Sequence, residues 1–354
     1  MWQCTQAVTD GLIAATQALL HIDSPTGFTG RISEYLMDRL TALGFAPERT
    51  AKGAVRVCLG GEGERVLLMA HVDTLGAMVR AVKEDGRLRF EPVGGLRMQN
   101  IEGEHVRVYT RDGPVVEGTI QCVSASSHVY DDAGQLPRKP ENMEVVLDAR
   151  VHSAEDVHAL GVMAGDFICL DPRTRVSGDG YLKSRFLDDK ASAGVLLTLA
   201  EQVARGACTP ACRLYLLFTT YEEVGHGGAA GIPEGMDTCI SVDMGCVGDD
   251  LSCDETMVSI CAKDSGGPYD YDTVSRLVDA AKRLKLSYAV DLYPHYGSDV
   301  EATLSAGHDV RHGLIGPGVF ASHGYERTHR EGLANTLMLL MGCFMQSSQK
   351  NHDQ

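Results

Sequence analysis

The fold of this chain is decided by residues 65–73, which read Arg-Val-Leu-Leu-Met-Ala-His-Val-Asp. Residues 66–70 are all apolar, whereas a strand with one face in water would alternate apolar and polar residues. An apolar run of this length predicts a strand that is buried on both faces, as in a parallel sheet covered by helices. Residues 213–219 and 238–243 have the same character, so we expect several such strands in one sheet.

Outward from this stretch, strand patterns alternate with helical patterns. We expect helices over residues 10–20, 30–43, 188–205, 271–284, 299–306 and 331–345. Alternating strands and helices predict an α/β fold, with a mixed, mostly parallel sheet flanked by helices. A further short helix is expected near residues 227–232, and Gly316-Pro317-Gly318 reads as a glycine-rich turn.

The pattern changes between residues 77 and 172, where short β-like segments are separated by Gly, Asp and Pro. A structureless loop of this length would be abnormal in a compact domain. We therefore predict an inserted β-rich, barrel-like domain over residues 77–172. Residues 1–76 and 173–354 would together form a single α/β domain that the insertion splits.

The composition excludes several classes of protein. The 354 residues include 48 Asp and Glu but only 32 Lys and Arg, so the formal charge of −16 argues against a nucleic-acid partner. No stretch approaches the roughly 20 apolar residues of a membrane span, so no membrane is expected as a partner. The N-terminal residues lack a basic segment followed by an apolar run, and the 11 cysteines show no disulfide spacing. These features favour a cytoplasmic protein with free thiols.

The end of the first apolar strand carries His71 and Asp73. Residues i and i+2 of an extended chain point to the same side, so the Asp73 carboxylate can accept a hydrogen bond from the ring of His71. Such a partner fixes the tautomer of a metal-binding histidine. Taken alone, the pair is weak evidence, because a histidine near a strand end is more often a hydrogen-bonded structural residue.

Carboxylates gather at the ends of other predicted elements. Asp188 and Asp189 open a helix, Glu222 and Glu223 follow one buried strand, and Asp243 ends another. Each has a simpler explanation, such as helix capping or a solvated loop. In open α/β sheets, however, ligands bind at the carboxyl ends of the strands.

A second histidine, His323, follows the glycine-rich segment at residues 316–318. Carboxylates together with two imidazoles form a ligand set suited to two Zn²⁺ ions, or to Co²⁺ or Mn²⁺. Two such ions can bind both the attacking and the leaving oxygen of a hydrolysis.

Six motifs, in this order and spacing, make the chain recognisable. They are Met69-Ala-His-Val-Asp73, Pro92-Val-Gly-Gly95, Ser184–Asp189, Thr219–Gly225, Ser241–Gly245 and Ser322–Glu326. With them the chain resembles metallopeptidase family forty-two, the glutamyl and deblocking aminopeptidases that include the tetrahedral TET enzymes. The resemblance implies that the inserted domain forms dimers and that the dimers assemble into a homododecamer.

The resemblance also implies a role for each metal-site residue. His71 and Asp243 would bind opposite metal ions, and Asp188 would bridge them. Glu223 and His323 would complete the ligand set. A cis peptide bond is expected between Asp188 and the residue that follows it.

Two further roles come from the same resemblance. Glu222 would be the catalytic base, and Asp73 would orient His71. The chain departs from the family pattern at two positions beside the site, where Lys190 replaces an arginine and Gly324-Tyr325 replaces a Ser-Pro-like pair. Both departures bear on substrate preference more than on metal binding.

The sequence thus predicts a two-metal aminopeptidase that removes N-terminal residues from short peptides. The nearest alternative is a related two-metal deacylase or dipeptidase, because such enzymes use similar ligand sets. A non-catalytic assembly protein on the same scaffold is a third reading, against which the intact ligand set and Glu222 argue. The sequence leaves open the preferred N-terminal residue, the physiological metal, and whether dimers or dodecamers form.

Overall fold

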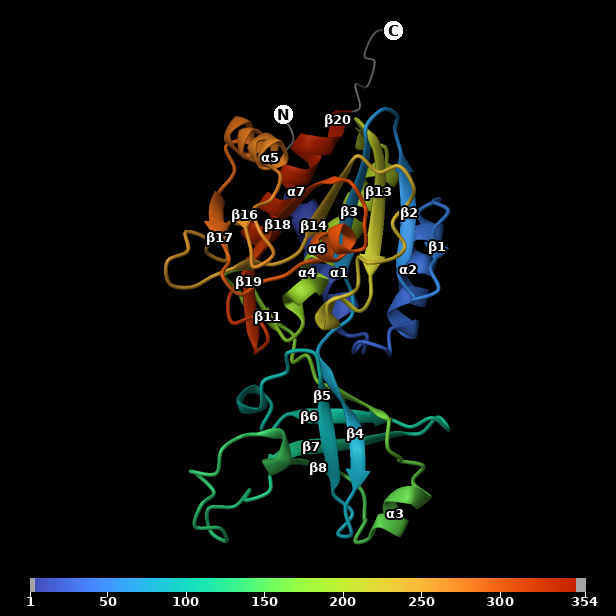
Figure 1. The fold of residues 1–354 in the computed structure, drawn as a ribbon, viewed down its shortest axis with the longest axis vertical. Coiled ribbons are helices and arrows are strands. Elements are labelled where there is room, and N and C mark those ends of the chain that lie inside the picture. The colour runs from blue at the N-terminus through green and yellow to red at the C-terminus, as the bar shows by residue number, and fades with distance from the viewer. Residues whose placement is uncertain (1–3, 348–354) are drawn as a thin grey trace.

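The computed structural model describes residues 4–347. Figure 1 shows two parts: an α/β unit, which contains the first and the last described elements, and a smaller barrel attached to one end of it. The mostly parallel sheet with flanking helices, and the inserted β-barrel, are the fold that the sequence predicted.

The α/β unit is built on a nine-stranded sheet. Its main strand order is β1 (Glu48–Arg49), β2 (Val55–Gly60), β13 (Arg213–Thr219), β3 (Arg65–His71), β14 (Thr238–Val242), β18 (Arg311–Val319), β16 (Val258–Lys263) and β17 (Tyr288–Leu292), with β15 (Gly245–Cys246) paired to β18. The four central strands β13, β3, β14 and β18 run parallel to one another. Their carboxyl ends therefore meet at one edge of the sheet.

Strand β3 is buried on both faces, as its apolar run predicted. Val66, Leu68 and Ala70 join the larger hydrophobic core. Leu67 and Met69 alternate with them and join a second, smaller core on the other face. Side chains of a strand point to opposite faces in turn, so a strand between two cores needs an apolar residue at every position.

Helices cover both faces of the sheet (Figure 1). The larger core is covered by α1 (Gln6–Leu20), α2 (Gly30–Ala42), α4 (Leu187–Ala204), α5 (Tyr271–Leu284) and α7 (Arg330–Phe344), whereas α6 (Asp299–Ser305) packs on the other face. All six lie where the sequence predicted helices. Within residues 4–347, no helix has the combination of length and apolarity that a bilayer crossing would require.

The prediction of a turn at residues 316–318 was wrong, because these residues lie inside the central strand β18. Their glycines reflect close packing of backbones. A Cβ atom on Gly316 would fall 1.7 Å from the carbonyl oxygen of Asp243, and one on Gly318 would fall 2.1 Å from that of Asp254. Only glycine fits where two backbones approach this closely.

The short helix expected at residues 227–232 is also absent. A short 3₁₀ turn, Glu222–Val224, forms just before this stretch. The backbone N–H of Gly228 donates a 2.6 Å hydrogen bond to the buried carboxylate of Asp299. This contact with α6 holds the segment against the sheet in place of helical hydrogen bonds.

The inserted barrel is closed and antiparallel. Around the barrel the strands follow the order β4 (Gly76–Val82), β5 (Leu88–Val93), β8 (Met143–Leu147), β7 (Val115–Cys122), β6 (His105–Tyr109) and β9 (Phe167–Leu170). Closure removes the exposed sheet edges that a small β domain would otherwise present. A short helix, α3 (Ala154–Ala159), lies between β8 and β9.

Two small sheets complete the α/β unit. They comprise β10 (Arg175–Val176), β11 (Tyr181–Ser184) and β19 (Glu326–His329), and separately β12 (Cys208–Pro210) with β20 (Met345–Ser347).

A charged contact joins the barrel to the α/β unit. Arg107 in β6 donates two hydrogen bonds of 2.7 Å to the carboxylate of Asp23, and Tyr109 donates a third of the same length. Burial alone would raise the pKa of Asp23, but the hydrogen bonds from Arg107 and Tyr109 and the charges of Arg107 and Lys190 together lower it. A guanidinium that binds both oxygens of a carboxylate fixes the relative orientation of the two groups in addition to pairing their charges.

Candidate metal centre

The candidate site lies at the carboxyl-terminal edge of the central parallel strands. Strand β3 ends at His71, β13 leads into the turn that carries Glu222 and Glu223, and β14 leads directly to Asp243. Parallel strands bring these distant residues together because their ends share one edge.

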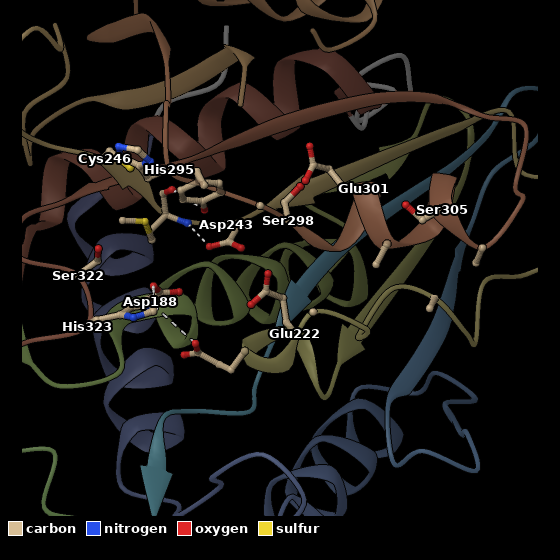
Figure 2. A pocket seen from close by; sticks show the side chains of 18 of the residues that line it. Asp188, Glu222, Asp243, Cys246, His295, Ser298, Glu301, Ser305, Ser322 and His323 are labelled. Atoms are coloured by element: carbon tan, nitrogen blue, oxygen red, sulfur yellow. Dashed lines mark hydrogen bonds and ion pairs between the residues drawn. The ribbon is translucent and has the colours of Figure 1, made fainter. Parts of the chain in front are cut away.

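A cavity of about 700 Å³ opens at this edge. Four of the predicted carboxylates line it, together with His323 and the segment from His295 to Ala306. Figure 2 shows Asp188, Glu222 and His323 facing one another across the cavity, with Ser298, Glu301 and Ser305 on the wall formed near α6.

His71 and Asp188 are in direct contact. The Nε2 atom of His71 lies 3.0 Å from Oδ1 of Asp188 and 3.7 Å from Oε2 of Glu222. The peptide bond between Asp188 and Asp189 is cis, as the family resemblance implied.

His323 approaches the same carboxylate from the other side. Its Nε2 atom lies 3.7 Å from Oδ2 of Asp188 and 3.6 Å from Oε2 of Glu223. Asp188 thus stands between the two histidines, with one oxygen toward each.

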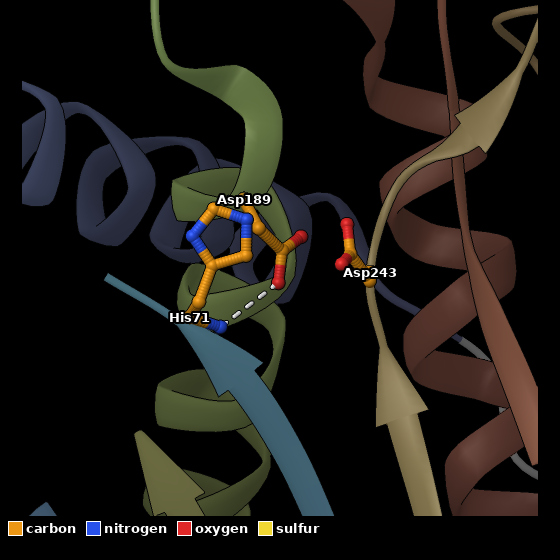
Figure 3. Close-up of side chains that lie close together, drawn as sticks. All are labelled: His71, Asp189 and Asp243. Atoms are coloured by element: carbon orange, nitrogen blue, oxygen red, sulfur yellow. Dashed lines mark hydrogen bonds between the residues drawn. The ribbon is translucent and has the colours of Figure 1, made fainter. Parts of the chain in front are cut away.

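Asp243 belongs to a neighbouring group with His71 and Asp189, shown in Figure 3. The ligand atoms of these three residues lie within 4.8 Å of one another, and so do those of His71, Asp188 and Glu223. Asp189 was not among the predicted site residues, although it follows Asp188 directly. Its Oδ2 accepts a 3.2 Å hydrogen bond from the His71 backbone, and its buried Oδ1 has no partner among the described residues.

Asp73 makes different contacts from those expected. The Nδ1 atom of His71 lies 2.9 Å from the backbone carbonyl of Asp73 and 3.7 Å from its carboxylate. The carboxylate instead accepts hydrogen bonds from the backbone N–H groups of Glu222 and Glu223, at 3.2 and 3.4 Å, and from the Thr26 hydroxyl at 2.6 Å. Asp73 therefore holds the turn that carries both glutamates.

Glu326 is a positioning residue that the sequence reasoning did not single out. It is buried, and its two oxygens accept 3.1 Å hydrogen bonds from the backbone N–H groups of Asp188 and His323. One carboxylate thereby fixes the backbone of two predicted ligands. The sequence feature that could have identified Glu326 is its position three residues after His323, inside the Ser322–Glu326 motif.

Burial and mutual repulsion raise the pKa values of the clustered carboxylates. Burial lifts the pKa of Glu222 and of Glu223 well above the usual value, and nearby carboxylates add to the shift. The same two causes raise the pKa of Asp243 to about 7. Asp188 is the exception, because its contact with His71 outweighs burial and lowers its pKa.

The donor set fits divalent cations. The carbonyl of Asp73 can only accept a hydrogen bond, so Nδ1 of His71 carries a hydrogen. Nε2 is the ring atom that faces Asp188, and it can bind a metal ion once it is deprotonated. The ion pairs made by Asp188, Glu222 and Glu223 with other described residues are all to the two histidines. Buried carboxylates that lie this close together need a cation to stay ionised.

Solved structures share this fold. The Pyrococcus horikoshii TET1 peptidase, whose reported structures describe assembly into a tetrahedron or a large octahedral shell, is 23% identical to this chain with a TM-score of 0.81. The comparison covers 94% of this chain and 98% of that one. At this level of identity the likeness establishes the fold, which is that of a TET-type peptidase.

The sequence establishes the family. The family model described as M42 glutamyl aminopeptidase matches residues 53–339, so the chain belongs to this family of metal-dependent peptide hydrolases. A Bacillus subtilis protein named "Putative aminopeptidase YhfE" is 43% identical over 91% of this chain and 94% of its own length. The glutamyl aminopeptidase of Lactococcus lactis is 29% identical over 62% of this chain and 61% of its own. The protein is therefore an aminopeptidase by family.

Proposed function

We propose that the protein is a two-metal aminopeptidase that removes N-terminal residues from short peptides, with Glu222 as the general base. The observation that carries the proposal is the position of Glu222. Its carboxylate lines the cavity with Oε2 3.7 Å from Nε2 of His71, while Asp73 holds its backbone.

Five residues would hold the two divalent ions. They are His71, Asp188, Glu223, Asp243 and His323, with Asp188 between the two sites. Two imidazoles and three carboxylates favour Zn²⁺, and also accept Co²⁺ or Mn²⁺. When bound, the ions would polarise the scissile carbonyl and lower the pKa of water at the site.

Glu222 would move the proton. A carboxylate whose pKa is raised by burial is a stronger base than a solvated one, and can later act as an acid near neutral pH. Glu222 would take a proton from the attacking water and deliver it to the leaving amine.

Asp73 and Glu326 would keep these groups in place. Asp73 binds the backbone of the Glu222-Glu223 turn, and Glu326 binds the backbone of Asp188 and His323. Fixed donors and ligands lose little free energy to reorganisation during the reaction.

A panel of aminoacyl and acylated substrates tests the activity. Purified protein would be assayed with Zn²⁺, Co²⁺ or Mn²⁺ added, and free amino acids and free acyl groups would be measured separately. We expect release of the N-terminal residue from peptides with a free amino group. Release of acetate from N-acetylated residues without aminopeptidase activity would identify a deacylase instead.

We further propose that the barrel forms dimers and that these assemble into a homododecamer. Apolar side chains exposed on the barrel support this, including Val129, Tyr130 and Val146, which are 71%, 40% and 36% exposed. Size-exclusion chromatography with light scattering would measure the mass. A monomeric mass at micromolar concentration would contradict the proposal.

We also propose a cytoplasmic location. All 11 cysteines are free, and most of them are buried. Buried unpaired thiols are typical of proteins kept in a reducing compartment. Cell fractionation would check the location, and recovery outside the cytoplasmic fraction would contradict it.

A further inference from the structure

A second cavity, of about 610 Å³, lies at the junction of the α/β unit and the barrel. The start of α2, the loop between β1 and β2, the β6–β7 hairpin and Tyr221 form its walls. Tyr221 directly precedes Glu222, so this cavity and the metal centre share one short segment of chain. None of the predicted metal ligands lines it.

The lining of this cavity is cationic. Arg31, Arg49 and Lys52 face it, and it has no acidic lining residue. None of the three forms an ion pair with a carboxylate in the described part of the chain.

Arg49 lies over the beginning of α2. Its Nη2 atom is 3.8 Å from the position that a Cβ on Gly30 would take, and 3.9 Å from that on Gly53. Thr29, the residue before the helix, makes no side-chain capping hydrogen bond. The partial positive charge of the helix start therefore adds to that of the arginine.

The other two cations are held by aromatic rings. The Arg31 guanidinium lies 4.5 Å from the centre of the Tyr109 ring and donates a 2.9 Å hydrogen bond to the Tyr109 hydroxyl. The Lys52 ammonium lies 5.4 Å from the ring centre of Tyr221 and donates to the backbone carbonyl of His226. Both positive groups are thus oriented by aromatic rings, and neither forms an ion pair with a described carboxylate.

We propose that this cavity binds a small anion carrying phosphate or carboxylate groups, at a site separate from the metal centre. Converging cations at a helix start bind such oxyanions through charge-assisted hydrogen bonds. The cavity has room for more than one such group. The proposal does not depend on the proposed catalytic mechanism.

Isothermal titration calorimetry of the metal-loaded protein tests this inference. The probes would be inorganic phosphate and succinate, each at constant ionic strength set with sodium chloride. We expect saturable binding of at least one probe and weakening by about tenfold or more in Arg49→Gln, since losing one charge-assisted contact has this effect. Binding of phosphate alone would assign a phosphate-bearing ligand, and binding of succinate alone a carboxylate-bearing one.

Arg89→Gln is the matched control, because Arg89 is an exposed arginine on barrel strand β5, outside the cavity lining. It should bind as the wild type does, and Arg49→Lys should recover part of the affinity. Absence of saturable binding by either probe would overturn the proposal. So would binding that is equal in wild type and Arg49→Gln, because such an anion would lie elsewhere, for example on the metals.

Discussion

The two cavities beside Tyr221 have opposite charge and opposite burial. The metal centre gathers carboxylates that are nearly enclosed, and the side chains of Glu223 and Asp188 are only 4% and 12% exposed. The second cavity gathers cations of which Arg31 and Arg49 are exposed to solvent. Water stabilises the exposed arginines without a partner, whereas enclosed carboxylates lose that stabilisation. The acidic cavity therefore needs its cations for stability, and the basic cavity does not need its anion.

The largest expected effect is on turnover. Glu222→Gln keeps the shape of the side chain but removes the base, so kcat should fall by about 10²–10⁴-fold. Metal content, measured by mass spectrometry of the purified protein, should not change. Glu234→Gln, on an exposed glutamate outside the site, is the control and should retain wild-type kcat. Substantial activity in Glu222→Gln would contradict the assignment of Glu222 as the general base.

Metal removal should destabilise the protein. Adding Zn²⁺ to chelator-stripped protein at about 100 times its Kd should raise the free energy of unfolding by about 2.7 kcal/mol, because the ion binds only the native state. Thermal unfolding with and without Zn²⁺ measures this. Mg²⁺ should have a smaller effect, since it prefers all-oxygen octahedral sites. A Tm that is indifferent to the chelator would contradict the cation requirement of the acidic cavity.

The stability of the metal-stripped protein should also depend on pH. The pKa of Asp243 is raised from 3.8 to about 7, so the native state holds a proton that the unfolded state releases in this window. The free energy of unfolding should therefore fall as pH rises from about 4 to about 7. The raised pKa of His71 acts in the same direction at pH values above its ordinary pKa of 6.5. Thermal unfolding should show a weaker dependence in Asp243→Asn, and an unchanged slope in that variant would refute the assignment.

Glu326 should affect metal affinity without touching a metal. Glu326→Gln replaces one of the two acceptors that hold Asp188 and His323, so we expect affinity to fall by about 10–100-fold, as for other residues that orient ligands. Competition with a chromophoric chelator would measure the affinity. Arg327→Gln is the neighbouring control, because Arg327 pairs with Glu255 instead. Equal losses in both variants would indicate a general structural effect.

The smallest expected effect concerns the basic cavity. Arg49→Gln should change the free energy of unfolding by less than about 0.5 kcal/mol, because Arg49 is exposed and no ion pair is recorded for it among the described residues. Urea denaturation without added anions checks this. A loss of several kcal/mol would mean that the arginine has a structural role, and that the two cavities are less different than their burial indicates.

Patterns of apolar and polar residues were sufficient to predict the buried strands of the sheet. They failed where close packing against a distant segment determines which residue is present. The continuous apolar run at residues 66–70 identified a strand between two cores, because such a strand has no polar face. The same logic missed strand β18, since Gly316, Pro317 and Gly318 resemble a turn. The two glycines are required by the backbones of Asp243 and Asp254, which lie close by in space but far away in sequence.

The candidate site likewise contains residues that sequence patterns predicted and residues that they did not. The sequence selected His71, Asp188 and Glu222 because carboxylates and histidines recur at strand ends, and the structure brings these groups to one edge. It did not select Asp189 or Glu326, whose importance lies in contacts with backbone groups. It also assigned the Asp73 carboxylate to His71, although that carboxylate binds the Glu222-Glu223 turn.

By itself, the sequence determined which strands are buried, that a β-rich segment interrupts the α/β unit, and which chemical groups end the central strands. These properties follow from the order of apolar and polar residues along the chain. Only the tertiary structure decided which groups meet. Asp188 reaches both histidines, and Arg31, Arg49 and Lys52 line one cavity together with Tyr109 and Tyr221, through contacts between distant segments. Hydrogen bonds and electrostatic interactions depend on distance in space, which local sequence patterns do not specify.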